Sequence, residues 1–266
     1  MSIFLTILVL CMASIHSVLN LSVWDFLTNP NSTIEEDLTL IQTLNKDGLQ
    51  FFYLNQELGH DRRIQMDLNN VSAIVNYWMK GLPLKVTVHG WHGSENAIYG
   101  VYEINDAYIG LGGFNIITVD WSSFASNSEY AYSAAVALTV GTGVAVFLEN
   151  VVNLTKISPT DIHLIGYNLG AHVVGRCGYR FRLGKIGRIT ELQKCSQQRA
   201  YELYRDFLKY NSSFIGTFCD SYENYMFKHC EDQEKIPMGH YANLTIFGGG
   251  SYYLSTNDKS PFHGIN

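Results

Sequence analysis

Three short runs of mostly apolar and β-branched residues each predict a strand in the interior of the protein. Such near-continuous runs are typical of parallel strands whose two faces are both covered, whereas half-exposed strands alternate apolar and polar residues. Between the second and third runs, residues 130–154 form an apolar stretch that is too long for a strand and predicts a helix. The three strand runs are PLKVTVHGW (83–91), FNIITVDW (114–121) and TDIHLIGYN (160–168).

The C-terminal part of the chain predicts a further helix and two further strands. In SQQRAYELYRDFLKY (196–210) the apolar residues recur with helical spacing, which predicts an amphipathic helix. YANLTIFGGGSYYLST (241–256) predicts two strands joined by a glycine turn. The alternation of strands and helices indicates an α/β fold. Since no repeat, low-complexity tract or Pro/Gly-rich linker divides the chain, we expect a single domain over residues 18–266.

The first residues have the layout of a secretory signal peptide. An apolar run at 3–12 precedes the small residues Ala13, Ser14 and Ser17, although no Lys or Arg stands before it. The run is short for a membrane span, which needs about 20 residues, so a membrane anchor is the weaker alternative. We expect a signal over residues 1–17, with cleavage after Ala13 or Ser17, and no later segment that crosses a bilayer.

Sequons and cysteines also favour an extracellular protein. Four cysteines remain after Cys11 in the predicted signal, an even number that suits disulfides in an oxidising compartment; buried free thiols are the alternative. The short spacing between Cys219 and Cys230 favours that pair. Six Asn-x-Ser/Thr sequons are present, at Asn20 and at the five predicted glycosylation sites Asn31, Asn70, Asn153, Asn211 and Asn243.

Composition and charge narrow the class of protein. Hydrophobic residues make up 47% of the chain and charged residues 16%, as in a packed globule rather than a disordered chain. The formal net charge is −6 and no basic run stands out, which argues against a nucleic-acid partner. The glycine-rich pieces lack the pattern of phosphate loops, and no His, Cys and Asp cluster has metal-ligand spacing. We therefore expect no cofactor and no metal.

The segment GYNLG, from Gly166 to Gly170, predicts a sharp turn between a strand and a helix. In α/β-hydrolases a Gly-x-Ser-x-Gly turn at this place holds the nucleophile in a strained backbone conformation, and the glycines avoid collisions of side chains. The middle position here is Asn168, a residue that tolerates positive φ better than most. Asn168 can thus serve the turn alone or also contact a ligand.

Five stretches stand along the chain in the order VHGW (88–91), DAYIGLGGFNIITVDWSSFA (106–125), VGTGVAVFL (140–148), DIHLIGYNLGAHVVG (161–175) and GRITELQ (187–193). This order of motifs resembles the animal lipase family, which includes pancreatic lipase, insect phospholipases A1 and dipteran yolk proteins. The resemblance implies an α/β-hydrolase fold, with a mostly parallel central sheet, helices on both faces and a truncation around the lid region.

All three positions that correspond to the family's catalytic triad carry amides. Asn168 stands at the nucleophile position, Gln193 at the acid and Gln197 at the base. An amide has no removable proton near neutral pH and cannot stabilise an imidazolium as a carboxylate does. We therefore expect no catalytic residue at these positions. A triad rebuilt from other residues is the alternative; His89 and His172 match structural positions of the family motifs.

The resemblance also implies a deletion. Gln193 and Gln197 are four positions apart, whereas several dozen residues, including the lid, separate acid and base in active relatives. The family usually pairs the cysteine at the position of Cys195 inside that segment, so Cys177 is a candidate replacement partner. The N–H groups of Trp91 and Leu169 correspond to the family's oxyanion hole, and such a remnant could bind a carbonyl or carboxylate.

The sequence thus predicts a secreted, extracellular lipase homologue without ester hydrolysis, which binds a lipid or other hydrophobic molecule or serves as a structural protein. The alternative is a lipase or phospholipase A1 with weak activity from a non-standard site. A third hypothesis is a protein retained only for contact with a protein partner.

Overall fold

In the computed structural model the chain divides into two compact units, residues 1–197 and 198–266. The single domain expected over residues 18–266 stays a prediction. The predicted signal, Gln193, Cys195 and the sequons at Asn31, Asn211 and Asn243 lie outside the described residues. The structure describes residues 43–44, 46, 48–68, 70–96, 101–192, 197–210, 214–220, 224–225, 227–237, 252–254 and 256.

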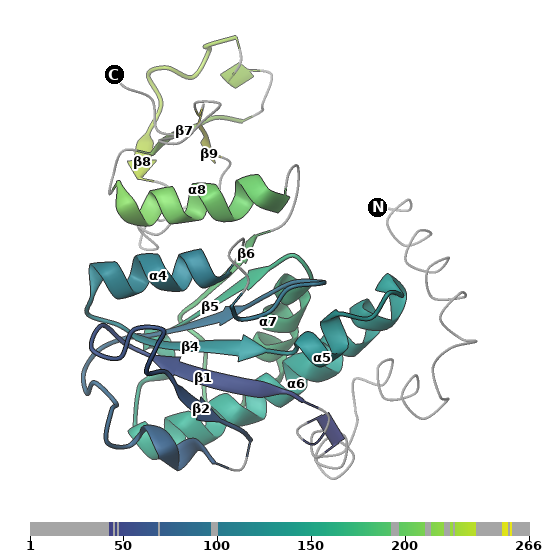
Figure 1. The fold of residues 1–266 in the computed structure, drawn as a ribbon. Coiled ribbons are helices and arrows are strands. Elements are labelled where there is room, and N and C mark those ends of the chain that lie inside the picture. Colours follow the sequence, from purple (N-terminus) through teal and green to yellow (C-terminus); the bar gives the residue numbers. More distant parts are fainter. Residues whose placement is uncertain are drawn as a thin grey trace. The chain divides into compact units, whose positions relative to one another are not determined.

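A six-stranded sheet forms the centre of the first unit, with the strand order β2-β1-β4-β3-β5-β6 (Figure 1). β3, β4, β5 and β6 run parallel to one another, and β1 pairs antiparallel with β4 and β2. This arrangement confirms the predicted α/β class and its mostly parallel sheet. The strands are β1 (Gln50–Leu54), β2 (Ile64–Met66), β3 (Leu84–Val88), β4 (Asn115–Asp120), β5 (Ile162–Tyr167) and β6 (Arg188–Leu192).

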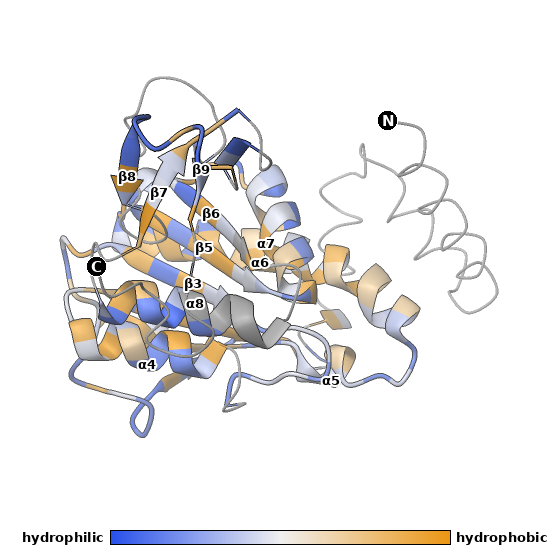
Figure 2. Cartoon of the chain, turned by 90° about the horizontal axis from the view of Figure 1, so that it is seen from above, coloured by the Kyte–Doolittle hydropathy of each residue, from blue (hydrophilic) through white to orange (hydrophobic). Residues whose placement is uncertain are grey.

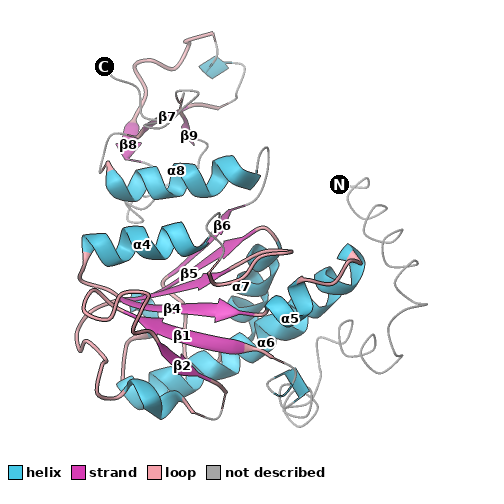
Figure 3. Ribbon diagram, in the orientation of Figure 1, coloured by secondary structure: helices cyan, strands magenta, loops and turns pink. Residues whose placement is uncertain are grey.

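The three apolar runs form β3, β4 and β5 as predicted, and helices cover both faces of the sheet (Figure 3). α6 (Tyr130–Thr155) and α7 (Leu169–Arg180) pack on one face, where their apolar residues form one core with Val86, Ile117 and Leu164. α4 (Val101–Leu111) packs on the other face. The shorter elements are η1 (Val71–Ile74), α5 (Ser122–Ala125) and η2 (Pro159–Asp161).

The long helix α6 corrects one expectation from the sequence. Within the described part of the chain, α6 alone is long and apolar enough to cross a bilayer. By length and composition, the expectation that no later segment could cross a bilayer is therefore wrong. Most of its apolar stretch is buried in the fold, and the first unit packs α6 beside α7 (Figure 2). Burial against the sheet accounts for the apolar composition without a membrane.

The face of the sheet that α4 covers contains polar side chains that the apolar pattern did not reveal. Lys85 on β3 is only 7% exposed, and its Nζ lies 5.4 Å from the ring centre of Tyr108 and 4.9 Å from that of Phe114. Thr87, also on β3, donates a hydrogen bond of 2.9 Å to Oδ1 of Asn105 on α4. Burial and, to a smaller extent, the nearby charge of Arg188 together lower the pKa of Lys85 to about 8.

The second unit contains the predicted helix and a small sheet. α8 (Gln197–Lys209) matches the amphipathic pattern found in the sequence. The sheet has the order β8-β7-β9, and both pairs of strands are antiparallel. Only its last strand belongs to the tail in which two strands were expected, and residues 241–251 and 255 of that tail lie outside the described residues. The strands are β7 (Ile215–Phe218), β8 (Lys235–Pro237) and β9 (Tyr252–Tyr253).

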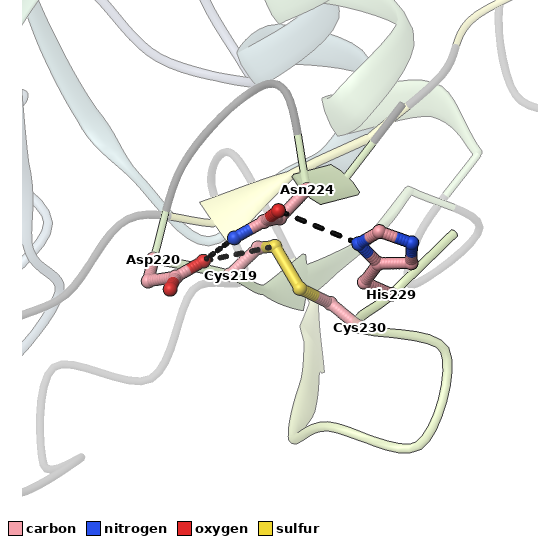
Figure 4. The surroundings of a disulfide bond; sticks show 5 residues. All are labelled: Cys219, Asp220, Asn224, His229 and Cys230. Atoms are coloured by element: carbon pink, nitrogen blue, oxygen red, sulfur yellow. Dashed lines mark hydrogen bonds between the residues drawn. A yellow bond between two sulfur atoms is a disulfide. The ribbon is translucent and has the colours of Figure 1, made fainter. Parts of the chain in front are cut away.

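A disulfide bond joins Cys219 to Cys230 in the second unit, the pair that their spacing favoured (Figure 4). Asp220, Asn224 and His229 surround it, and Nδ2 of Asn224 donates a hydrogen bond of 2.8 Å to Oδ1 of Asp220. The Asp220 carboxylate and the two sulfurs lie close together, but disulfide sulfurs are not thiolate ligands, so this group does not form a metal site.

Cys177 corrects a second expectation. It is a free cysteine, fully buried among the core residues of α7, and burial raises the pKa of its thiol well above the usual range. It is therefore not the replacement partner of Cys195 that the sequence suggested, because its side chain faces the apolar core. The two described sequon residues, Asn70 and Asn153, are both exposed, and their glycosylation stays a prediction.

Candidate functional site

A sharp turn at Asn168 connects β5 to α7. Asn168 has φ 54° and ψ −121°, and α7 begins at the next residue, Leu169. A positive φ is strained for most residues with a side chain, and asparagine is among the few that adopt it. The predicted turn, with its unusual backbone at Asn168, is thus confirmed.

The two glycines of the turn are required by close backbone contacts. A Cβ on Gly166 would lie 2.3 Å from the carbonyl oxygen of Gly170. A Cβ on Gly170 would lie 2.2 Å from the carbonyl oxygen of Val88 at the end of β3. β3, β5 and the first turn of α7 therefore approach one another more closely than any side chain permits, which positions the loop after β3 beside Asn168.

The side chain of Asn168 accepts hydrogen bonds from both N–H groups that were expected to form an oxyanion hole. Its Oδ1 lies 2.7 Å from the backbone nitrogen of Leu169 and 3.1 Å from that of Trp91. The loop containing Trp91 lies close because Gly90 has no side chain, and a Cβ there would lie 2.5 Å from Cβ of Asn168. The sequence suggested a remnant hole that could bind an external carbonyl, but in the structure the amide of Asn168 already occupies both donors.

The loop after β3 is held by contacts of its own. Nε1 of Trp91 donates a hydrogen bond of 3.0 Å to the carbonyl of Asn127, and the N–H of His92 donates one of 2.9 Å to Ala125. Nε1 of Trp121 donates one of 2.8 Å to the carbonyl of His89. The N–H of Trp91 is therefore directed toward Asn168 by the fold of the loop, independently of the Asn168 side chain.

His89 lies beneath this loop and is 2% exposed. Its Nδ1 lies 2.9 Å from the carbonyl oxygen of Gly90, and its Nε2 lies 3.1 Å from Oδ1 of Asp120. Burial would by itself raise the pKa of the Asp120 carboxyl, but its hydrogen bonds with His89 and Ser122 outweigh burial and lower that pKa. Both ring nitrogens of His89 are engaged, so these contacts fit a structural role rather than that of a general base.

Gln193 and Gln197 stand at the positions that correspond to the acid and the base of the family's triad. The last residue of β6, Leu192, pairs with Tyr167, and its carbonyl accepts a hydrogen bond of 3.3 Å from the N–H of Asn168. The turn at Asn168 thus lies beside the end of β6, and Gln193 lies outside the described residues. Gln197 is the first residue of α8. His172 lies on α7 and is exposed.

A mostly parallel sheet, a strained turn between strand and helix and two convergent N–H donors are the features of the α/β-hydrolase class. The family model described as Lipase matches residues 27–194, and the chain belongs to the lipase family. The matched segment ends one residue after Gln193, close to the interval in which the resemblance implied a deletion.

Several curated lipases and a phospholipase are similar to this chain. It is 33% identical to hepatic triacylglycerol lipase of Oryctolagus cuniculus over 193 residues, which cover 70% of this chain and 38% of that protein. It is 30% identical to phospholipase A1 1 of Dolichovespula maculata over 176 residues, or 63% of this chain and 55% of that protein. The matches therefore span 38% and 55% of the length of these relatives.

Proposed function

We propose that this chain is a lipase-family protein that does not hydrolyse esters and that binds a lipid or another hydrophobic molecule. The observation that carries this proposal is the amide at the turn. Asn168 has the backbone conformation and location of the nucleophile, but it offers no hydroxyl or thiol that a base could deprotonate. The relatives are named as lipases and a phospholipase A1, which supports a lipid-like ligand.

The environment of Asn168 adds to this support. Removal of one member of an intact triad lowers turnover by several orders of magnitude, and in this sequence all three positions carry amides. His89 is nearly inaccessible and is hydrogen-bonded at both ring nitrogens, which argues against its recruitment as a substitute base. The alternative function, weak ester hydrolysis from a non-standard site, needs a nucleophile other than Asn168.

Secretion to the extracellular space belongs to the same proposal. It is supported by the signal-like first residues, by the exposure of Asn70 and Asn153 and by the disulfide bond between Cys219 and Cys230. Expression in insect or mammalian cells tests it. We expect the protein in the medium, with a mass that decreases after removal of N-linked glycans.

Ester hydrolysis by the purified protein tests the central proposal. We expect no turnover of p-nitrophenyl butyrate or of a long-chain triacylglycerol above that of the N168A variant, and no covalent adduct with a fluorophosphonate. Turnover by the wild-type protein, or an adduct on any side chain, contradicts the proposal and supports the alternative.

Lipid extracted from the purified protein and identified by mass spectrometry tests ligand binding. A protein free of lipid that also fails to bind a fluorescent fatty acid favours contact with a protein partner instead.

A further inference from the structure

The amide oxygen of Asn168 stands where an oxyanion hole would receive a substrate oxygen. We infer that Asn168 is an internal ligand of this hole, so that the carbonyl or carboxylate of a bound lipid is excluded from it. The inference rests on the proposed function, since it concerns the same site. It also specifies the mode of binding: a lipid in this region would be held by its apolar part and not by its acyl oxygen.

The pattern of hydrogen bonds distinguishes this role from ordinary capping of a helix. An N-cap side chain usually accepts from the second or third N–H of the helix. Oδ1 of Asn168 accepts instead from the first residue, Leu169, and from Trp91, which lies 77 positions earlier in the chain. The distances of 2.7 and 3.1 Å are both those of normal N–H···O hydrogen bonds. A local turn does not need the second of these bonds.

The two donors are both used by this arrangement. Each backbone N–H has a single hydrogen, and a carbonyl oxygen accepts two hydrogen bonds through its two lone pairs. An incoming ester or carboxylate oxygen would therefore have to displace the Asn168 amide, and that amide would then need new partners. The binding free energy gained by a ligand carbonyl is therefore small, because one hydrogen-bond acceptor merely replaces another.

We expect the two donors to remain in place when the Asn168 side chain is removed. The Trp91 loop is held by the hydrogen bonds from Trp91 Nε1 to Asn127 and from His92 to Ala125, and the Leu169 N–H is fixed as the first of α7. A variant without the side chain should thus present two converging N–H groups. Preorganised donors of this kind stabilise a negative oxygen, and the N-terminus of a helix adds to that effect.

The matched variants N168G and N168D test the inference in the full-length protein. Glycine removes the side chain and adopts the positive φ without strain. Aspartate keeps an acceptor oxygen at the same place. The probe is decanoate, added to 15N-labelled protein, and the signals are the backbone amides of Trp91 and Leu169.

We expect both amides of N168G to shift in a saturable way, with decanoate bound roughly tenfold or more tighter than by the wild-type protein. The wild-type protein and N168D should show no shift at these two amides. The inference is overturned if decanoate shifts them equally in the wild-type protein, or if the amides of a folded N168G do not respond.

Hydrogen exchange of the Trp91 amide provides a second measurement that needs no ligand. It should be slow in the wild-type protein and in N168D, and faster in N168G. Should N168G fail to fold, comparison of the wild-type protein with N168D still decides the matter, because rapid exchange at Trp91 in both rules out the internal ligand. Ester hydrolysis by the wild-type protein would refute the proposed function alone, since the amide signals report on the hole separately.

Discussion

An asparagine at φ 54° and ψ −121° combines two properties that few residues share. Its backbone tolerates the left-handed region, as glycine does, and its side chain ends in an oxygen that accepts two hydrogen bonds. At this turn both properties are used, because Oδ1 meets the N–H groups of Leu169 and Trp91. A serine at the same place would have a shorter side chain with only one heavy atom beyond Cβ.

The two properties can be separated by comparing N168G with N168A. Both variants lose the same two hydrogen bonds, but only alanine has a Cβ that is strained at positive φ. We expect N168A to have a free energy of unfolding about 1 kcal/mol lower than that of N168G. Urea denaturation followed by circular dichroism measures the difference. Equal stabilities would mean that the turn relaxes to negative φ when the amide is lost.

At the residue scale the sequence predicted the place of Asn168 and its backbone, but not the contact it makes. The motif GYNLG and the apolar run before it indicate a strand, a turn and a helix, and these are local features. The hydrogen bond to Trp91 joins positions 77 apart and depends on how closely β3 and β5 approach. The three-dimensional path of the loop at residues 89–93 is what directs the Trp91 N–H at the amide.

At the scale of elements, the packing of α7 against β3 depends on Gly170. A Cβ there would lie 2.2 Å from a backbone oxygen of Val88, which cannot move aside as the end of a flexible side chain could. We expect G170A to lower the free energy of unfolding by about 3 kcal/mol, at the upper end of the usual cost of overpacking, or to prevent folding.

G110A is the matched control for G170A. Gly110 lies in α4, is exposed, and has nothing within 4 Å of the position of a Cβ. Since alanine is the better helix former, G110A should raise the free energy of unfolding by about 0.5–1 kcal/mol. Thermal or urea denaturation of both variants tests the pair, and a G170A protein as stable as wild type would contradict the close packing.

The buried Lys85 on β3 makes the stability of the sheet dependent on pH. Its pKa in the folded protein is about 8, below its usual value of 10.5, so the folded state releases this proton more readily than the unfolded state does. The charge therefore opposes folding at neutral pH, and the wild-type protein should gain stability as the pH rises from about 8 to about 10.5.

K85M removes the buried charge, so its stability should not share the rise with pH that is expected for the wild-type protein. At pH 7 we expect its free energy of unfolding to be about 1–3 kcal/mol higher than that of the wild-type protein, after allowance for the lost contact with Tyr108 and Phe114. The difference should shrink as the pH approaches 10.5. Urea denaturation at several pH values measures it, with K80M at an exposed position as the control. A constant difference across this range would contradict the lowered pKa.

Apolar runs predicted the main elements well, because strands of a parallel sheet that is covered on both faces are buried along their whole length and therefore consist mostly of apolar residues. β3, β4, β5 and the long helix α6 all follow from such runs. The same reasoning overlooked Lys85, since a single cation inside an apolar run does not change the strand pattern. The strands β7 and β8 were also missed, because segments of three or four residues are too short for a pattern to emerge.

At the scale of the whole chain, the first unit and the family match end at nearly the same place. The Lipase family model matches residues 27–194, and the first unit extends to Gln197. The interval between Gln193 and Gln197, where the resemblance to active relatives implied a deletion, falls at this boundary. The second unit contains a helix, a three-stranded sheet and the disulfide bond between Cys219 and Cys230.

Because this disulfide closes a short loop within the second unit, its reduction should affect that unit first. Cross-linking residues separated by 11 positions restricts the unfolded chain and stabilises the folded one by roughly 2–3 kcal/mol. Hydrogen exchange followed by mass spectrometry, with and without dithiothreitol, measures the effect by segment. We expect faster exchange in peptides from residues 214–237 after reduction, and unchanged exchange in β3 and β5.

The double variant C219S/C230S without reductant is the control, since Cys177 is buried and unpaired in either case. If β3 and β5 lost protection to the same extent, the bond would stabilise the first unit as well, contrary to this prediction.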